Sequence, residues 1–181
     1  MKRFTALAVA LTMLAAAPSF AGNPMVGGQQ MYASKDIIDN AVHSADHTTL
    51  VAAVKAAGLV ETLKGPGPFT VFAPTNEAFA KLASGTVDTL LKPENKDALV
   101  KVLTYHVVPG RLTKASIERQ IKDGGGKTAF RTVGGGTLTA TIHGGKLVLE
   151  DEKGGMSMVT IPDVMQSNGV IQVVDTVLMP N

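Results

Sequence analysis

The sequence predicts an α+β fold, in which helices come first and a mainly antiparallel sheet follows. Three observations predict it. Apolar residues recur at helical spacing through much of the segment from residue 34 to residue 121. From residue 137 onward, short runs of β-forming residues are separated by clusters of glycine. No alternation of strands with helices, internal repeat or long linker interrupts the chain, so we expect a single domain.

The first predicted elements are helices. Ser34 is a candidate N-cap, and the residues that follow it have a helical period, with Ile37, Ile38, Ala41 and Val42 on the apolar face. The clearest helical pattern ends at Gly58, a suitable C-terminal cap, and its apolar stripe is Leu50, Val51, Val54 and Ala57. One further turn over 59–63 ends at 65–68, where two prolines remove backbone donors and force a turn.

A strand is predicted over 69–73, and helices follow it. Thr75 or Asn76 caps a helix that carries Ala78, Phe79 and Leu82. Pro93 suits the first position of the next helix, whose apolar face is Leu99, Val102 and Leu103. A short helix is expected over 115–121.

The second half of the chain is predicted to be mostly strands. Segments 137–142 and 146–149 form a hairpin around the turn His143-Gly144-Gly145. Segments 156–161 and 170–178 are further strand candidates.

The first 21 residues have the pattern of a secretory signal peptide. Lys2 and Arg3 form a basic start, 4–17 carry no charge, and small residues stand at Ser19 and Ala21. The uncharged run is shorter than the about 20 residues that span a bilayer, which argues against the alternative of a retained membrane anchor. We expect cleavage after Ala21, a flexible tail over 22–33, a folded domain over 34–181, and a location in a periplasm or outside the cell.

Composition excludes several classes of function. The formal charge of +2 comes from Lys2 and Arg3 alone, so the segment after Ala21 is neutral. Neutrality, dispersed Lys and Arg, and few aromatic residues argue against nucleic-acid binding. The absence of cysteine excludes disulfides, thiol nucleophiles and Cys-ligated metals. No segment after the signal is apolar enough to cross a membrane.

Histidines are the first residues to consider for a metal or catalytic site. His43 and His47 are four residues apart and could share a helix face as zinc or copper ligands. The segment 44–46 between them looks like a helix end, which favours two ordinary surface histidines. His143 is most simply a turn residue.

Two further motifs are weaker. Residues 124–128 (GGGKT) resemble the end of a phosphate-binding loop, but Ile121 stands where the motif needs glycine, so a turn is favoured. Residues 150–152 (EDE) lack the spacing of a calcium loop and are interpreted as a solvated turn. No Gly-x-Ser-x-Gly elbow or paired carboxylates stand out. We therefore predict no enzyme activity, no metal and no cofactor.

Three segments together resemble the fasciclin-domain family. Residues 67–79 (GPFTVFAPTNEAF) are similar to its first signature segment, and 167–180 (SNGVIQVVDTVLMP) to its second. Between them, 103–110 (LTYHVVPG) resembles the Tyr-His segment of that family. The resemblance extends from about Ser34 to Pro180, nearly the whole of the chain after the signal. It implies a wedge-shaped β-sandwich with helices packed at one end, in which the two signature segments are neighbouring strands.

The resemblance also implies candidate residues for partner binding. In animal members, receptor binding is attributed to the Tyr-His segment, which is Tyr105-His106 here, and to a segment that matches Pro162-Asp163-Val164-Met165. The alternative is that Tyr105 and His106 are half-buried and hydrogen-bonded within the fold.

Two functional hypotheses follow. The first is an exported, non-enzymatic adhesion module that binds a protein or glycan of a cell surface or extracellular matrix. A single domain then needs a second binding face, a second protein or a weak homo-oligomer to join two surfaces. The second is a periplasmic small-molecule or metal-binding protein, with a pocket that uses His43, His47 or His106 as polar contacts.

Overall fold

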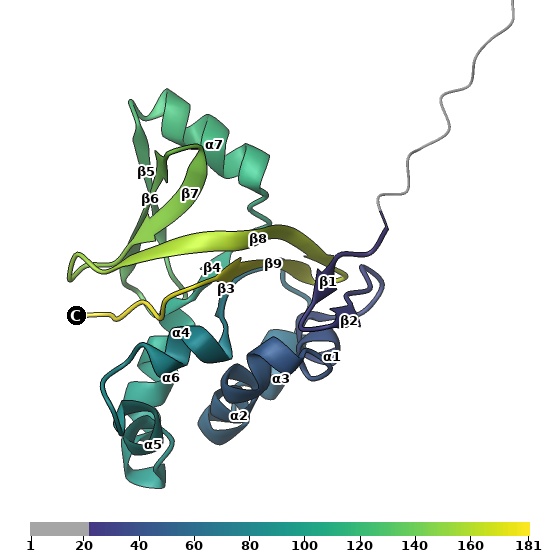
Figure 1. The fold of residues 1–181 in the computed structure, drawn as a ribbon, viewed down its shortest axis with the longest axis vertical. Coiled ribbons are helices and arrows are strands. Elements are labelled where there is room, and N and C mark those ends of the chain that lie inside the picture. Colours follow the sequence, from purple (N-terminus) through teal and green to yellow (C-terminus); the bar gives the residue numbers. More distant parts are fainter. Residues whose placement is uncertain (1–21) are drawn as a thin grey trace, which may run out of the picture.

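The computed structural model describes residues 22–181, and the predicted signal peptide lies outside them (Figure 1). The helices are α1 (Ile37–Ala41), α2 (Thr48–Ala57), α3 (Val60–Lys64), α4 (Asn76–Ala80), α5 (Thr86–Leu90), α6 (Lys96–Tyr105) and α7 (Lys114–Asp123), with 3₁₀ turns η1 (Ala45–His47) and η2 (Pro93–Asn95). The strands are β1 (Met25–Val26), β2 (Gln29–Gln30), β3 (Phe69–Pro74), β4 (Val107–Pro109), β5 (Lys127–Arg131), β6 (Thr137–His143), β7 (Lys146–Glu150), β8 (Met156–Gln166) and β9 (Gly169–Val174).

Seven strands form one sheet in the order β4-β3-β9-β8-β7-β6-β5. All neighbours are antiparallel except β3 and β9, which run parallel and are paired from Phe69↔Gly169 to Pro74↔Val174. The two segments that resemble the fasciclin signatures are therefore neighbouring central strands, as the resemblance implies.

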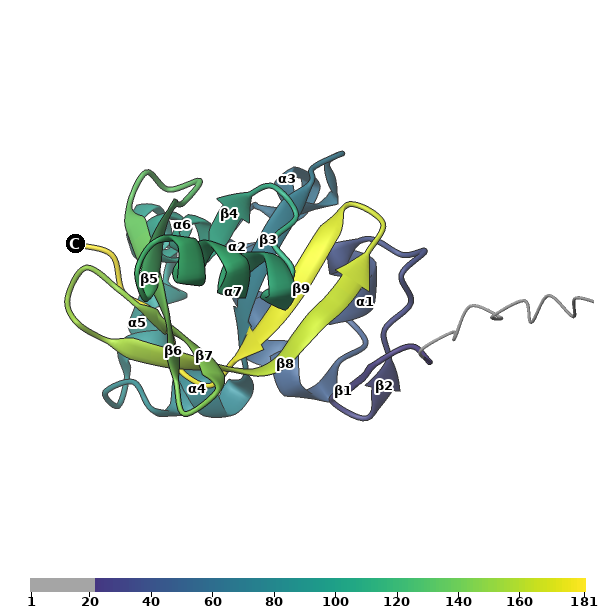
Figure 2. The ribbon, with the colours of Figure 1, turned by 90° about the horizontal axis from the view of Figure 1, so that it is seen from above.

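The sheet folds over at β8 into a sandwich. The first residues of β8 pair with β7 and the remainder pairs with β9, with register shifts in between that let the strand bend. The sheet is nearly closed, because Val133, just after β5, donates a backbone hydrogen bond of 2.7 Å to the carbonyl of Val107 in β4. α7 lies over β5, β6 and β7, whereas α1 to α6 lie on the opposite side of β3 and β9 (Figures 1 and 2).

Alternate residues of the central strands face two separate cores. Phe72 of β3 and Val174 of β9 point into the core between the sandwich layers, which also holds Leu138, Leu149 and Ile117. Their neighbours point toward the helices, and that second core includes Val71, Ala73, Ile171, Val173, Val54 and Leu103. Both faces of β3 and β9 are therefore covered, as near-continuous apolar runs require.

Capping residues determine where the helices that cover the sheet begin and end. Gly58 ends α2 with a left-handed φ of 72°, as its position in the sequence predicts. Thr75 caps α4 immediately after β3, because its side chain accepts a hydrogen bond from the Ala78 backbone N–H. Asp36, rather than the predicted Ser34, caps α1, and its carboxylate accepts from the Asp39 N–H at 2.8 Å.

The segment predicted to be a flexible tail, 22–33, is packed in this structure. β1 and β2 form a short ribbon, and Val26 and Met31 are buried in the helix-side core. The Ala45 backbone N–H also donates to the carbonyl of Gly27. Two isolated apolar residues show no periodicity, so the sequence alone did not reveal this packing.

Phe72 provides a direct test of the sandwich core. Its side chain is fully buried, so we expect Phe72→Ala to lower the free energy of unfolding by about 3–5 kcal/mol. Chemical denaturation measures this loss. Val42→Ala at an exposed position is the control and should change stability by less than about 0.5 kcal/mol. A loss below about 1 kcal/mol for Phe72→Ala contradicts its place in the core.

Candidate functional site

Tyr105, the last residue of α6, is buried inside the sandwich. Its hydroxyl donates a 2.7 Å hydrogen bond to the Thr137 carbonyl and accepts one from the Glu152 backbone N–H. Burial raises the pKa of this phenol to about 12, and the nearby carboxylates of Glu152 and Asp151 act in the same direction. Tyr105 therefore joins α6 to β6 and to the turn after β7.

His106 caps α6 and is also fully buried. Its Nδ1 lies 2.8 Å from the Val102 carbonyl, and its Nε2 lies 3.0 Å from the Leu178 backbone N. A carbonyl only accepts and an N–H only donates, so these partners assign the proton to Nδ1 and the lone pair to Nε2. Burial lowers the pKa of His106 to about 4, because the charged ring would lose its hydration inside the fold.

The segment Pro162 to Met165 lies in the bent part of β8. Asp163 is the one non-glycine residue within 22–181 with a left-handed φ, at 57°. Its carboxylate accepts from the backbone N–H of Lys114, at the start of α7, and from the Gln172 side chain in β9. Val164 is buried, whereas Pro162 and Met165 are half-buried. The Asp163 carboxylate therefore connects the start of α7 to β8 and β9.

The structure does not bring the two predicted binding segments together. Tyr105 and His106 precede β4, at one edge of the sheet, and β3 and β9 separate β4 from β8. Three strand spacings correspond to about 14 Å. The two ring centroids are 6.4 Å apart in an edge-to-face arrangement, and the residues are only 1% and 2% exposed. Tyr105 and His106 therefore have the surroundings expected of residues that are hydrogen-bonded within the fold.

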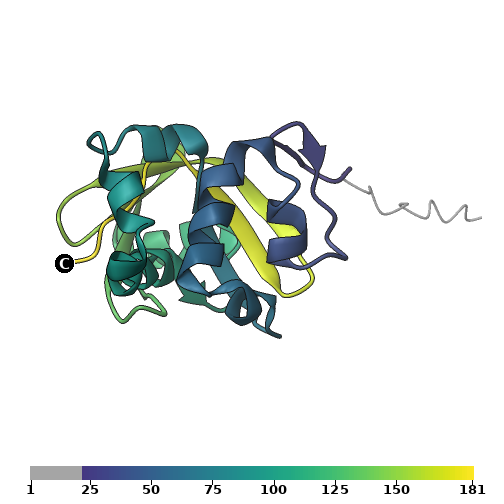
Figure 3. The same ribbon diagram turned by 90° about the horizontal axis from the view of Figure 1, so that it is seen from below.

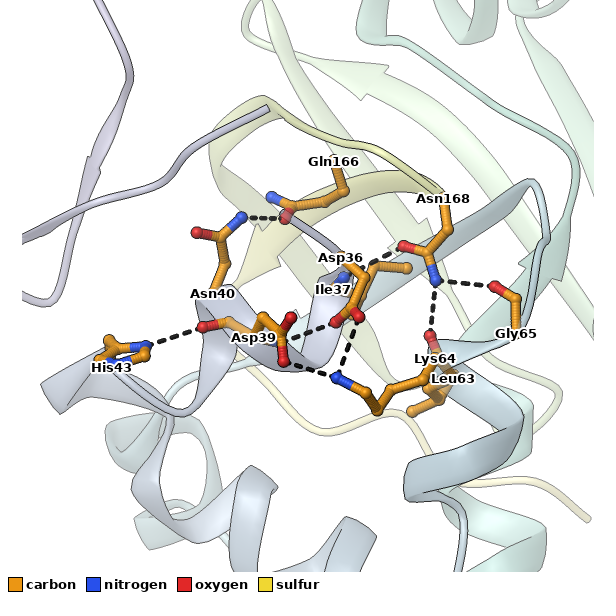
Figure 4. Close-up of polar contacts among 10 residues, drawn as sticks. All are labelled: Asp36, Ile37, Asp39, Asn40, His43, Leu63, Lys64, Gly65, Gln166 and Asn168. Carbon is orange, nitrogen blue, oxygen red and sulfur yellow. Dashed lines mark hydrogen bonds and ion pairs between the residues drawn. The ribbon is translucent and has the colours of Figure 1, made fainter. Parts of the chain in front are cut away.

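A polar network that the sequence did not reveal surrounds Asn168, at the turn between β8 and β9 (Figure 4). Its Oδ1 accepts from the Ile37 backbone N–H at 3.1 Å, and its Nδ2 donates to the carbonyls of Leu63 at 2.7 Å and Gly65 at 2.9 Å. One side chain thus ties the start of α1, the end of α3 and the second signature segment together.

Charged and amide side chains extend this network. Lys64 forms ion pairs with Asp36 at 3.0 Å and Asp39 at 2.5 Å, and Asn40 donates to Gln166. Burial raises the pKa of Asp36, but the Asp39 N–H and the Lys64 ammonium outweigh it and lower the pKa overall. The hydrogen bonds of Asn168 to residues more than 100 positions away leave no local pattern in the sequence.

The two histidines weighed as metal ligands have different surroundings. His43 is exposed, with its Nδ1 2.7 Å from the Asp39 carbonyl, whereas His47 is buried and bonded to Ser44. His43 lies in the turn after α1 and His47 ends η1, so the shared helix face does not form. Within residues 22–181, no three His, Asp or Glu side chains gather in a way that could hold a metal ion.

The other motifs are turns with structural contacts. Gly124 ends α7 and Lys127 begins β5, so no helix follows the lysine of the GGGKT segment. In the acidic run, Asp151 is buried rather than solvated. Its carboxylate accepts backbone N–H groups of Lys153, Gly155 and Met179, which fixes the C-terminal segment. No helix in the described range 22–181 has the length and apolar character needed to cross a bilayer.

Comparison with known proteins agrees with this fold. A family model described as "Fasciclin domain" matches residues 45–180. The chain belongs to the fasciclin-domain family. The protein sll1483 of Synechocystis sp. is 50% identical over 144 residues, which are 80% of this chain and 73% of that protein. The immunogenic protein MPB70 of Mycobacterium bovis is 34% identical over 190 residues, 97% of this chain and 90% of that protein.

Among solved structures, a FAS1 domain pair from the insect cell adhesion molecule fasciclin I has a similar fold. The TM-score is 0.72 at 16% sequence identity, and the match covers 80% of this chain and 51% of the domain pair. The fasciclin domain described here therefore corresponds to about half of that pair.

Replacing Asn168 tests the network in Figure 4. Asn168→Ala leaves one buried backbone N–H and two carbonyls without their side-chain partner, and each such group costs about 1–3 kcal/mol. We expect a loss of about 3 kcal/mol in the free energy of unfolding, measured by denaturation. Asn95→Ala removes one exposed hydrogen bond and should cost less than about 1 kcal/mol. Equal losses of unfolding free energy for the two substitutions would contradict the role of Asn168 in holding α1, α3 and the β8–β9 turn together.

The pKa of His106 predicts a pH dependence of stability. Between pH about 6.5 and about 4, an unfolded chain binds a proton at this residue and the folded chain does not. The free energy of unfolding therefore decreases by roughly 3 kcal/mol as the pH falls through this range. Burial also lowers the pKa of His47, which adds a change of the same sign.

The histidine contribution is isolated by comparing variants at pH 4.5 and pH 7. His106→Gln should reduce the difference in unfolding free energy between the two pH values. His143→Gln, at an exposed turn, should preserve it. An undiminished pH dependence in His106→Gln contradicts the assignment.

Proposed function

We propose that this fasciclin-domain protein is exported and binds a component of a cell surface or extracellular matrix without catalysing a reaction. Membership of the fasciclin-domain family over residues 45–180 is the observation that carries the proposal. The shared fold with a domain pair from an insect cell adhesion molecule supports it. Export is proposed from the signal-like sequence of residues 1–21.

The partner is proposed to bind at a surface hollow beside Pro162. This hollow has a volume of about 280 Å³ and is bounded by β8, the β6–β7 turn and the start of α7. Pro162 is the residue of the predicted 162–165 segment that lines it, and Thr160, Lys114 and Lys146 are among the others. Lys146 and Lys114, the latter in an exposed ion pair with Glu118 at 3.5 Å, favour an acidic group on the partner. Tyr105 and His106 then act on binding only through the fold.

Binding to immobilised matrix proteins and to acidic and neutral glycans tests this proposal. We expect saturable binding that favours acidic components, because of Lys114 and Lys146. Lys146→Glu should weaken it by at least fivefold, since it reverses the charge at the hollow. Lys92→Glu, an exposed lysine outside the hollow, is the matched control and should have little effect.

Two results contradict the proposal at different levels. Binding that is equally sensitive to Lys92→Glu and Lys146→Glu places the interaction elsewhere on the surface. Absence of binding to every component, together with unchanged attachment of cells that lack the protein, removes the adhesion function itself. Sedimentation at the binding concentration determines whether a weak homo-oligomer supplies the second binding face.

A further inference from the structure

The chain contains one Asn-Gly pair, Asn168-Gly169, at the turn between β8 and β9. Figure 3 shows this turn, in yellow, beside α1. Glycine lets the main chain bend back toward the preceding side chain, because it has no Cβ to restrict it. The glycine nitrogen can then attack the side-chain amide, which makes asparagine before glycine prone to deamidation. Asn168 is therefore both the centre of the network in Figure 4 and the asparagine with the most reactive neighbour.

Deamidation of Asn168 would replace its amide by a carboxylate. The Gly169 backbone nitrogen loses its proton to hydroxide and bonds to Cγ of Asn168, the Cγ–Nδ2 bond breaks, and Nδ2 leaves as ammonia. Water then opens the resulting cyclic imide at either of its two carbonyls. The product is aspartate, or isoaspartate, whose main chain runs through Cγ and is longer by one carbon. The net change consumes one water and releases one ammonia.

The folded chain holds both reacting groups in place. Asn168 is only 7% exposed, and its side chain has the three backbone partners drawn in Figure 4. Its carbonyl accepts a hydrogen bond of 3.0 Å from the Phe69 backbone N–H. Gly169 is packed so closely against Phe69 that no space remains even for a Cβ. Neither the amide nor the main chain can turn to form the imide without breaking these contacts.

The products of deamidation do not fit the site that the amide occupies. Nδ2 donates to the carbonyls of Leu63 at 2.7 Å and Gly65 at 2.9 Å. A carboxylate only accepts, so both carbonyls would lose their donor and face a negative charge, which is costly when buried. Isoaspartate would also lengthen the main chain beside the Phe69↔Gly169 pair, where the parallel register of β3 and β9 begins.

We propose that Asn168 is a deamidation site that the folded chain closes and unfolding opens, so that a chain left unfolded loses its ability to refold. Chemical modification of the unfolded state is one way in which unfolding becomes irreversible. Here one reaction is enough, because the residue that reacts also joins α1, α3 and the second signature segment. This site does not depend on the proposed surface binding, since other residues line the hollow beside Pro162.

Mass spectrometry of the unmodified full chain tests where the reaction occurs. The chain is kept at pH 8, either folded or unfolded in guanidinium chloride, and is then digested with trypsin. Residues 154–181 contain no lysine or arginine, so Asn168 is recovered in one peptide that fragmentation can assign. We expect conversion of Asn168 to be at least tenfold faster in the unfolded chain. Equal rates in the two states overturn the proposed protection.

Gly144→Asn is the matched control, because it creates a second Asn-Gly pair in the exposed β6–β7 turn. Gly144 has a left-handed φ of 56°, which asparagine tolerates, and a Cβ there would meet no other atom within 4 Å. In folded molecules of this variant, the new pair should be converted while Asn168 stays intact. Conversion of both pairs at the same rate would show that the fold does not shield Asn168.

Pulse proteolysis tests the consequence for refolding. Partly converted chains are refolded at the denaturant concentration where half of the unmodified protein is native, and a short protease treatment removes unfolded chains. Converted chains should survive at least tenfold less often than chains with intact Asn168. Asn168→Asp should be lost in the same way, whereas Asn95→Asp, which loses one exposed hydrogen bond, should survive several times more often. Equal survival of converted and intact chains overturns the proposal.

Discussion

The parallel pairing of β3 with β9 is the constraint on which the rest of this fold depends. It joins segments about 100 residues apart and lies inside the sheet, with β4 on one side and β8 on the other. The close approach begins at Gly169, where a Cβ would lie 2.0 Å from the Phe69 carbonyl oxygen. Gly169 has no positive φ, so the glycine is required for space rather than for a left-handed turn. Each face of the pair contributes residues to one of the two cores.

Polar groups around this pair connect it to the surrounding elements. Asn168 holds α1 and α3 at one end, and Gln172 of β9 donates to the Leu112 carbonyl and to Asp163. Tyr105 and His106 fix α6 and the C-terminal segment in the same way. These side chains are buried and hydrogen-bonded. They position the elements that form the surface but are not themselves exposed.

Most helices, the hairpin and the α+β class could be predicted from the sequence, because caps and apolar periodicity are local signals. Thr75 and Gly58 illustrate this, since each acts within one turn of its own position. The short β1–β2 ribbon and α5 could not be predicted, because their residues have little periodicity and are ordered by distant contacts. The buried state of Asp151 was also missed: its partners Gly155 and Met179 become neighbours only in the fold.

Candidate sites depend more than helices and strands on how distant segments pack. Motif resemblance identified Tyr105 and His106, but composition could not distinguish a buried, bonded ring from an exposed one. The burial of His47 depends on how the segment around Ser44 packs, which no spacing in the sequence encodes. Pro162 was identified by resemblance, whereas the hollow beside it requires α7 and the β6–β7 turn to be in place.

Native-state hydrogen exchange of backbone amides tests the central place of the β3–β9 pair most directly. If the pair is the last part to separate, the amides of β3 and β9, including Phe72 and Gln172, exchange only through global unfolding. Their exchange free energies then equal the free energy of unfolding measured by denaturant, and those of β5 and β6 are lower. Greater protection in α2 or in the β6–β7 hairpin than in β3 and β9 would contradict the account.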